Sequence, residues 1–133
     1  NKTGSVLDYG CGTGDLMAHL QAIGFTVSGA EPSAVATANA PKHIRENIKD
    51  PEDELRSSST YDVISLFHVL EHIPDPQDIL SQLKSKLNPG GHLIIAVPNP
   101  KSFDAQHYGK YWAAWDVPRH LWPRPIELAC KED

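Results

Sequence analysis

The feature that most constrains this 133-residue chain is a glycine-rich segment that follows a short apolar run. Gly10, Gly12 and Gly14 come directly after the apolar segment Ser5–Tyr9, and an amphipathic segment begins at Asp15. A buried strand, a glycine turn and a helix in this order place backbone N–H groups and a helix N-terminus beside a ligand. Because glycine lets a ligand approach the backbone closely, we expect a side chain at Gly10 or Gly12 to block the site.

The spacing of these glycines argues against a dinucleotide-binding loop. Such a loop has the pattern G-x-G-x-x-G, and its third glycine packs the helix on the strand beside a pyrophosphate. Here Asp15 stands at that position, and Asp8 adds a negative charge at the end of the strand. A carboxylate at Asp8 suits a ligand with an ammonium or sulfonium group. The plain alternative is a strand-to-helix turn that binds no ligand.

Three segments carry a resemblance to a known family. Residues 8–14, D-Y-G-C-G-T-G, match motif I of the class I S-adenosylmethionine-dependent methyltransferases, D/E-x-G-x-G-x-G, at all four fixed positions. Residues 61–76, Y-D-V-I-S-L-F-H-V-L-E-H-I-P-D-P, and residues 87–99, L-N-P-G-G-H-L-I-I-A-V-P-N, are similar to later motifs of that family. The resemblance implies an α/β fold, a Rossmann-like doubly wound sheet with parallel strand order 3-2-1-4-5. We expect the family's C-terminal strands to be missing.

The apolar pattern predicts the elements of this sheet. We expect strands at residues 5–9, 25–30, 44–48, 61–67 and 92–97, and helices that begin at Asp15, after Ser33 and after Pro76. Leu87 is expected on the last of these helices, before a turn at residues 88–91. Residues 1–100 are predicted to be the S-adenosylmethionine-binding core. Residues 101–133 are predicted to be a lid and acceptor segment with a truncated C-terminal helix of the same domain.

The resemblance implies S-adenosylmethionine as the cofactor and S-adenosylhomocysteine as its product. Glu31 ends the second predicted strand, where an acid holds ribose hydroxyls in nucleotide-binding sheets. Pro32 would lie along the adenine face, and Asn47, Asp50 and Asp53 are equal candidates for the adenine amino group. The residues expected to bind the cofactor are Asp8, Gly10, Cys11, Gly12, Gly14, Glu31, Pro32, Phe67 and His68.

The histidines offer two chemical roles. His68, Glu71 and His72 stand at i, i+3 and i+4, so they share a face if the segment is helical. Together with His120 they would form a general base or a divalent metal site, as in the similar turn of small-RNA 2′-O-methyltransferases. We favour a third interpretation, in which Glu71 and His72 stabilise the turn, and we expect no metal. Among these residues, His72 and His120 are the predicted catalytic groups.

A cluster of aromatic residues follows the last predicted strand. It lines an acceptor pocket or forms a core for the missing strands, and the sequence favours neither alternative. Its members are Tyr108, Tyr111, Trp112, Trp115 and Trp122.

Composition narrows the choice of partners. A net charge of −5 argues against a nucleic-acid backbone as the partner, and we expect a small-molecule acceptor, no membrane contact and a cytoplasmic location. Two cysteines make no disulfide framework. The predicted function is S-adenosylmethionine-dependent methyl transfer to oxygen or nitrogen. The alternatives are a non-catalytic S-adenosylmethionine-binding module and an NAD-dependent oxidoreductase.

Overall fold

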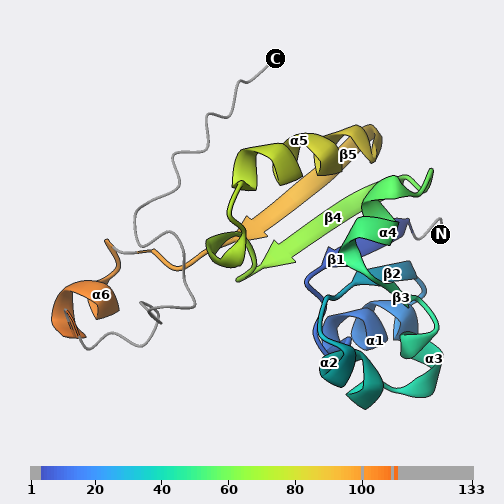
Figure 1. The fold of residues 1–133 in the computed structure, drawn as a ribbon, viewed down its shortest axis with the longest axis horizontal. Coiled ribbons are helices and arrows are strands. Elements are labelled where there is room, and N and C mark those ends of the chain that lie inside the picture. The colour runs from blue at the N-terminus through green and yellow to red at the C-terminus, as the bar shows by residue number, and fades with distance from the viewer. Residues whose placement is uncertain (1–3, 100, 109, 111–133) are drawn as a thin grey trace.

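In the part of the chain that the structure describes, strands alternate with one or two helices, and all five strands join one parallel sheet. The computed structural model describes residues 4–99, 101–108 and 110. The sheet has the order β3-β2-β1-β4-β5, which confirms the predicted Rossmann-like topology (Figure 1). Its strands are β1 (Ser5–Tyr9), β2 (Thr26–Ala30), β3 (Ile48–Lys49), β4 (Tyr61–Phe67) and β5 (Leu87–Ala96).

Helices cover the two faces of the sheet. They are α1 (Asp15–Ala22), α2 (Ala34–Asn39), α3 (Lys42–Arg45), α4 (Pro51–Arg56) and α5 (Pro76–Ser85). The chain also forms a 3₁₀ turn, η1 (Leu70–His72), and a further helix, α6 (Phe103–Tyr108). Two core clusters follow from this arrangement. One includes Leu7, Ile64 and Leu83 and joins β1 and β4 to α5, and the other includes Met17 and Ile44 and joins α1 and α3 to the sheet.

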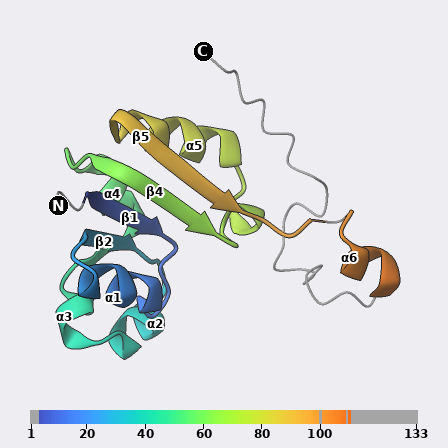
Figure 2. The same ribbon diagram turned by 180° about the vertical axis from the view of Figure 1, so that it is seen from behind.

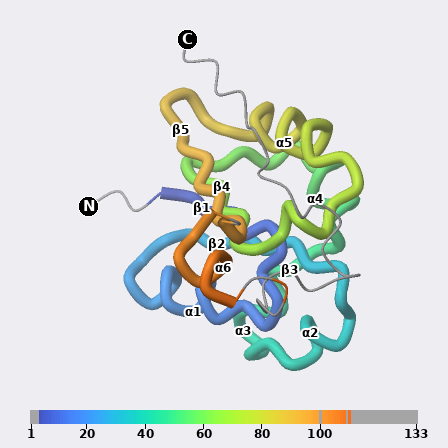
Figure 3. Tube along the Cα trace, turned by 90° about the vertical axis from the view of Figure 1, so that its left-hand side faces the viewer, coloured from blue at the N-terminus to red at the C-terminus, as the bar shows by residue number. Residues whose placement is uncertain are grey.

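The last described helix stands apart from this layered body. α6 lies beyond the carboxyl end of β5, away from the helices that cover the sheet (Figure 2). Seen from the side toward which β4 and β5 run, α6 is in front of the sheet (Figure 3). The strand ends that carry the candidate site therefore face the same side as α6.

The prediction of a third strand at residues 44–48 is wrong. Residues 42–45 form α3 instead, and the strand is only Ile48–Lys49. Ile44 and Ile48 are four residues apart, a helical spacing, and Ile44 is completely buried. The N–H groups of Ile44 and Arg45 both donate to the Pro41 carbonyl, which starts the helical turn.

Helix α4 was not predicted, although the sequence carries its start signal. Asp50 is the N-cap, and its side chain accepts a 2.9 Å hydrogen bond from the Glu52 N–H. Pro51 follows at the first helical position, and acidic residues fill the first turn. This combination of N-cap, proline and negative charge is typical of a helix N-terminus.

The boundary between α5 and β5 also differs from the prediction. α5 ends at Ser85, and Leu87 pairs with Tyr61 as the first residue of β5 instead of lying on the helix. The expected turn at residues 88–91 is included in the strand, with a register irregularity between Tyr61 and Val63. Beyond it His92 pairs with Val63, so the predicted strand from His92 onward is correct up to Ala96.

Candidate functional site

Three strands bring predicted site residues to one edge of the sheet. Asp8 and the glycine loop come at the end of β1, Glu31 follows β2, and His68 follows β4. Parallel strands that are joined by helical crossovers end on the same side, and ligands of such sheets bind there. The topology therefore gathers these residues from distant parts of the chain.

The backbone N–H groups of the glycine loop are bonded within the protein. The N–H groups of Gly10 and Cys11 both donate to the Ala30 carbonyl, at 2.7 and 3.1 Å. Gly14 N–H donates to the Cys11 carbonyl at 2.9 Å, and Gly12 N–H donates to Glu31 Oε2 at 2.8 Å. A pyrophosphate cradle needs such groups free to point at the ligand. This loop therefore lacks the donors that a dinucleotide would use at these four positions.

The three loop glycines are required for different reasons. All have positive φ angles, 85° at Gly10, 55° at Gly12 and 77° at Gly14, which disfavour any side chain. A Cβ at Gly10 would collide with Val69, and one at Gly14 would collide with Ile44. Only at Gly12 would it meet open space. A side chain at Gly10 would therefore disrupt packing against Val69, contrary to the expectation that it would block a ligand. Of the three loop glycines, only Gly12 has no protein atom within 4 Å of an added Cβ.

Glu31 connects the glycine loop to the start of α2. Its Oε2 accepts from Gly12 N–H, and its Oε1 accepts from Ser33 N–H at 2.9 Å. Each carboxylate oxygen has two acceptor positions, so each retains one for a ligand. The side chain is thus held in place with two neighbouring acceptors available, the arrangement that a vicinal diol requires. Pro32, next along the chain, is exposed.

Asp8 is a buried carboxylate at the centre of the site. Only 5% of the residue is exposed, and its Oδ1 accepts a 2.9 Å hydrogen bond from the Ser65 hydroxyl. Burial raises the pKa of Asp8 above its ordinary value of 3.8; the Ser65 hydrogen bond opposes the rise, and the charge of Glu31 adds to it. Ser65 was not among the predicted site residues, although a hydroxyl between the apolar residues Ile64 and Leu66 of a buried strand was a signal for it.

Cys11 is excluded as a nucleophile. Burial, together with the negative charges of Asp8 and Glu31, raises the pKa of its thiol to about 12. The thiolate is the reactive form of cysteine, so this side chain stays inert near neutral pH. Its sulfur packs in the core cluster with Met17, which leaves only its backbone toward the site.

The turn after β4 has an unusual backbone. His68 has a φ of 56°, the one positive value at a non-glycine position among residues the structure describes. Its N–H donates to the Ala96 carbonyl at 2.8 Å, and its Nδ1 lies 3.8 Å from Glu71 Oε1. Phe67, just before it, is 43% exposed.

The predicted shared face of His68, Glu71 and His72 is wrong. His68 has a left-handed φ of 56°, and the 3₁₀ turn begins only at Leu70, so the three residues do not follow one helical turn. Nδ1 of His68 lies 3.8 Å from Oε1 of Glu71, and His72 is exposed. Within residues 4–99, 101–108 and 110, no group of three His, Cys, Asp or Glu side chains is placed to hold a metal ion.

Part of the predicted site lies outside the described residues. This holds for His120 and for Tyr111, Trp112, Trp115 and Trp122. Tyr108 is described, on α6, and is 55% exposed. The two alternatives for the aromatic cluster both stay predictions.

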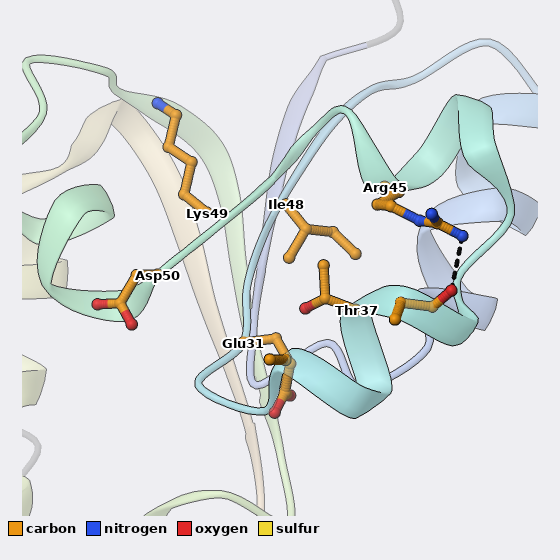
Figure 4. A pocket seen from close by; sticks show the side chains of 8 residues that line it. Glu31, Thr37, Arg45, Ile48, Lys49 and Asp50 are labelled. Carbon is orange, nitrogen blue, oxygen red and sulfur yellow. Dashed lines mark hydrogen bonds between the residues drawn. The ribbon is translucent and has the colours of Figure 1, made fainter.

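A pocket of about 410 Å³ adjoins the site on the β3 side (Figure 4). Residues of α2, α3 and β3 line it, together with Glu31 and Asp50. Of the three candidates for the adenine amino group, only Asp50 lines this pocket. Asn47 instead donates from its side chain to the His43 carbonyl at 3.2 Å, and Asp53 is exposed on α4.

Comparison with known proteins decides the family. The profile of the family described as "Methyltransferase domain" matches residues 1–128. The chain belongs to this family. The resemblance to class I methyltransferases that motif I predicted is thereby confirmed.

Curated relatives agree with this assignment. A ubiquinone biosynthesis O-methyltransferase of Acinetobacter baumannii (strain AYE) is 31% identical over 140 residues, which cover 93% of this chain and 59% of the relative. One of Vibrio parahaemolyticus is 35% identical over 104 residues, covering 71% of this chain and 43% of the relative. The chain therefore spans under two thirds of the length of these relatives.

Solved structures share the fold. The plantazolicin methyltransferase BpumL, in complex with a desmethyl analogue and S-adenosylhomocysteine, is 27% identical with a TM-score of 0.63, covering 71% of this chain and 39% of that one. The DhpI–S-adenosylhomocysteine complex is 26% identical with a TM-score of 0.57, covering 73% of this chain and 50% of that one. Among the described residues, no helix is both long and apolar enough to cross a membrane.

The raised pKa of Asp8 gives a test of this geometry. The folded protein holds the Asp8 proton more tightly than the unfolded chain does, so this group lowers stability as the pH rises above about 3.8. Asn at this position cannot ionise. We therefore expect the unfolding free energy of Asp8→Asn, relative to the wild type, to increase between about pH 3 and about pH 7 in urea titrations.

Asp62→Asn is the matched control, with the opposite sign. Hydrogen bonds from the Asn88 side chain and from Ser5 lower the pKa of Asp62. Its ionised form favours the folded state, so Asp62→Asn should lose stability relative to the wild type as the pH rises toward about 3.8 and above. If the unfolding free energies of the two variants, each relative to the wild type, changed in the same direction with pH, the burial of the Asp8 carboxylate would be contradicted.

Proposed function

We propose that this chain binds S-adenosylmethionine and transfers its methyl group to an oxygen of a small-molecule acceptor. The observation that carries the proposal is the pair of carboxylates, Asp8 and Glu31, around a loop whose N–H groups at Gly10, Cys11, Gly12 and Gly14 are bonded internally. Such a site repels phosphates and attracts a cation. The S-adenosylhomocysteine in the BpumL and DhpI structures and the O-methyltransferase names of the curated relatives support the same conclusion.

The site residues fit this ligand from one end to the other. The two free acceptor positions of Glu31 suit the ribose hydroxyls, and Asp50 suits the adenine amino group across the shared pocket. Asp8 lies where its charge offsets an ammonium or a sulfonium. Gly12 leaves room for the ligand. Pro32, Phe67 and His68 complete the proposed walls.

The protein's main contribution to methyl transfer is alignment. S-adenosylmethionine supplies the methyl group on a sulfonium, and an in-line displacement needs the acceptor oxygen to be held opposite the leaving sulfur. An acceptor hydroxyl must also lose its proton, so a general base is required. His72 and His120 are the residues that the sequence predicts for that role.

Further expectations from the sequence also stay proposals. They are the division into a core of residues 1–100 and a lid of residues 101–133, the cytoplasmic location, and the absence of nucleic-acid and membrane partners.

Titration calorimetry with S-adenosylhomocysteine and with NAD tests the proposed ligand. We expect the first to bind with micromolar affinity, about −8 kcal/mol, and NAD to give no saturable heat. The reason is the internal bonding of the loop donors that a pyrophosphate would need. Saturable NAD binding without a response to S-adenosylhomocysteine would favour the oxidoreductase alternative. Tight binding without methylation of catechol or benzylamine would favour a non-catalytic module.

Gly12→Ala should weaken S-adenosylhomocysteine binding by tenfold or more while the protein stays folded. A Cβ at this position meets no protein atom within 4 Å, so it would occupy volume that belongs to the ligand. Gly90→Ala is a matched control, because Gly90 also has a positive φ, 76°, and open space around it, but lies at the opposite end of β5. Calorimetry and thermal melting separate the two effects. Equal affinity losses in both variants would refute the placement of the ligand.

Glu31→Ala should weaken binding by about 1.5–3 kcal/mol, the range for hydrogen bonds to a charged group. The variant removes both proposed ribose contacts and also the acceptor of Gly12 N–H. Glu31→Gln keeps one side-chain oxygen and should lose less. Glu52→Ala, an exposed glutamate on α4, controls for loss of surface charge. Unchanged affinity in a folded Glu31→Ala protein would show that the acid only caps the turn.

A further inference from the structure

The backbone at His68 is held in a conformation that a histidine rarely adopts. Its φ of 56° lies in the left-handed region, where the Cβ of an L-residue is crowded. The 2.8 Å hydrogen bond from its N–H to the Ala96 carbonyl ties the residue to the end of β5. Strained residues of this kind persist only where the surroundings impose them, and they cluster at functional sites.

The strained turn is packed directly on the glycine loop. Val69, the next residue, lies so close to Gly10 that a Cβ there would collide with it. β4 and β1 are neighbours in the sheet, and Ser65 of β4 donates to Asp8 at the end of β1. His68 therefore stands beside the proposed cofactor site, on the same edge of the sheet as Asp8.

The surroundings of the imidazole differ at its two nitrogens. Nδ1 lies 3.8 Å from Oε1 of Glu71, whose side chain is 3% exposed, whereas the His68 side chain is 68% exposed. A buried carboxylate beside one nitrogen favours the proton on that nitrogen and leaves the other as an acceptor. Distances of this kind shorten when a substrate binds, so 3.8 Å is compatible with a hydrogen bond in the complex.

We propose that His68 is the general base for the acceptor and that Glu71 is the residue that positions its ring. This inference rests on the proposed methyl transfer. In the step, the acceptor O–H bond breaks and its proton goes to Nε2 of His68. The new O–C bond forms as the S–C bond of the sulfonium breaks, with the electron pair left on sulfur. The His68 imidazolium then returns the proton to water. We assign this role to His68 and not to the predicted catalytic His72, because the nitrogen that lies 3.8 Å from Oε1 of Glu71 is Nδ1 of His68.

The first test is spectroscopic and needs no turnover. Nitrogen-15 NMR of the histidine side chains, on the free and the S-adenosylhomocysteine-saturated protein, reports which ring nitrogen carries the proton. We expect the Nδ1–H form at His68 in the wild type, and a lower fraction of it in Glu71→Gln. A dominant Nε2–H form in both wild-type samples would overturn the dyad, whether or not the ligand binds.

The second test separates turnover from binding. His68→Asn removes the base but suits the left-handed backbone, because asparagine adopts that region readily. We expect transfer of a labelled methyl group to catechol to fall by 10²–10⁴-fold in this variant. Because His68 also lines the proposed cofactor site, S-adenosylhomocysteine affinity is measured in parallel, and we expect its loss to be much smaller than the loss of turnover. His92→Asn, at an exposed position within β5, is the control and should match the wild type.

The possible outcomes distinguish this inference from the function on which it rests. A wild-type protein that does not bind S-adenosylhomocysteine refutes the proposed function, while the NMR result still decides the His68–Glu71 pair. Turnover in His68→Asn that equals the wild type overturns the role of His68. A larger loss in His72→Asn than in His68→Asn assigns the base to His72 and overturns the proposal.

Discussion

The site depends on one carbonyl group, that of Ala30. It accepts hydrogen bonds from both Gly10 and Cys11, which fastens the start of the glycine loop to the end of β2. Glu31, the next residue, then reaches back to Gly12 N–H, so the neighbouring strand holds the loop at three points. This bonding sets the positive φ angles of the loop and also decides its chemistry. Donors that are committed to the protein cannot cradle a phosphate.

Because the N–H donors of the loop are bonded within the protein, the carboxylates of Asp8 and Glu31 give the site an excess of negative charge. Asp8 is buried, and its pKa is raised by that burial and by the charge of Glu31, despite the hydrogen bond from Ser65. Burial, together with the charges of the same two carboxylates, raises the pKa of the Cys11 thiol to about 12. A bound cation would offset the energy of holding these charges close together. The electrostatics of the site therefore select a ligand class before any detail of its shape is considered.

Sequence alone specified the centre of the fold better than its periphery. The bounds of β1 and β4 were predicted correctly, because short apolar runs bordered by polar turns leave few alternatives. The prediction of a strand at residues 44–48 was wrong because Ile44, although it is a core residue, lies on a helix. In the site, Asp8, Glu31 and the glycines could be located from their spacing. The strain at His68 could not, because a backbone angle imposed by Ala96 and the next strand has no signature in local sequence.

The contact between Gly14 and Ile44 has a consequence for how this sequence can change. A Cβ at position 14 would run into the Ile44 side chain, which is completely buried beneath the loop. The two positions are thirty residues apart in the sequence, yet neither can accept a larger residue unless the other gives way. Because the φ of 77° keeps position 14 a glycine, the constraint falls on position 44, which should hold no residue larger than isoleucine among relatives. The glycine motif thus limits the sequence of a helix in a distant part of the chain.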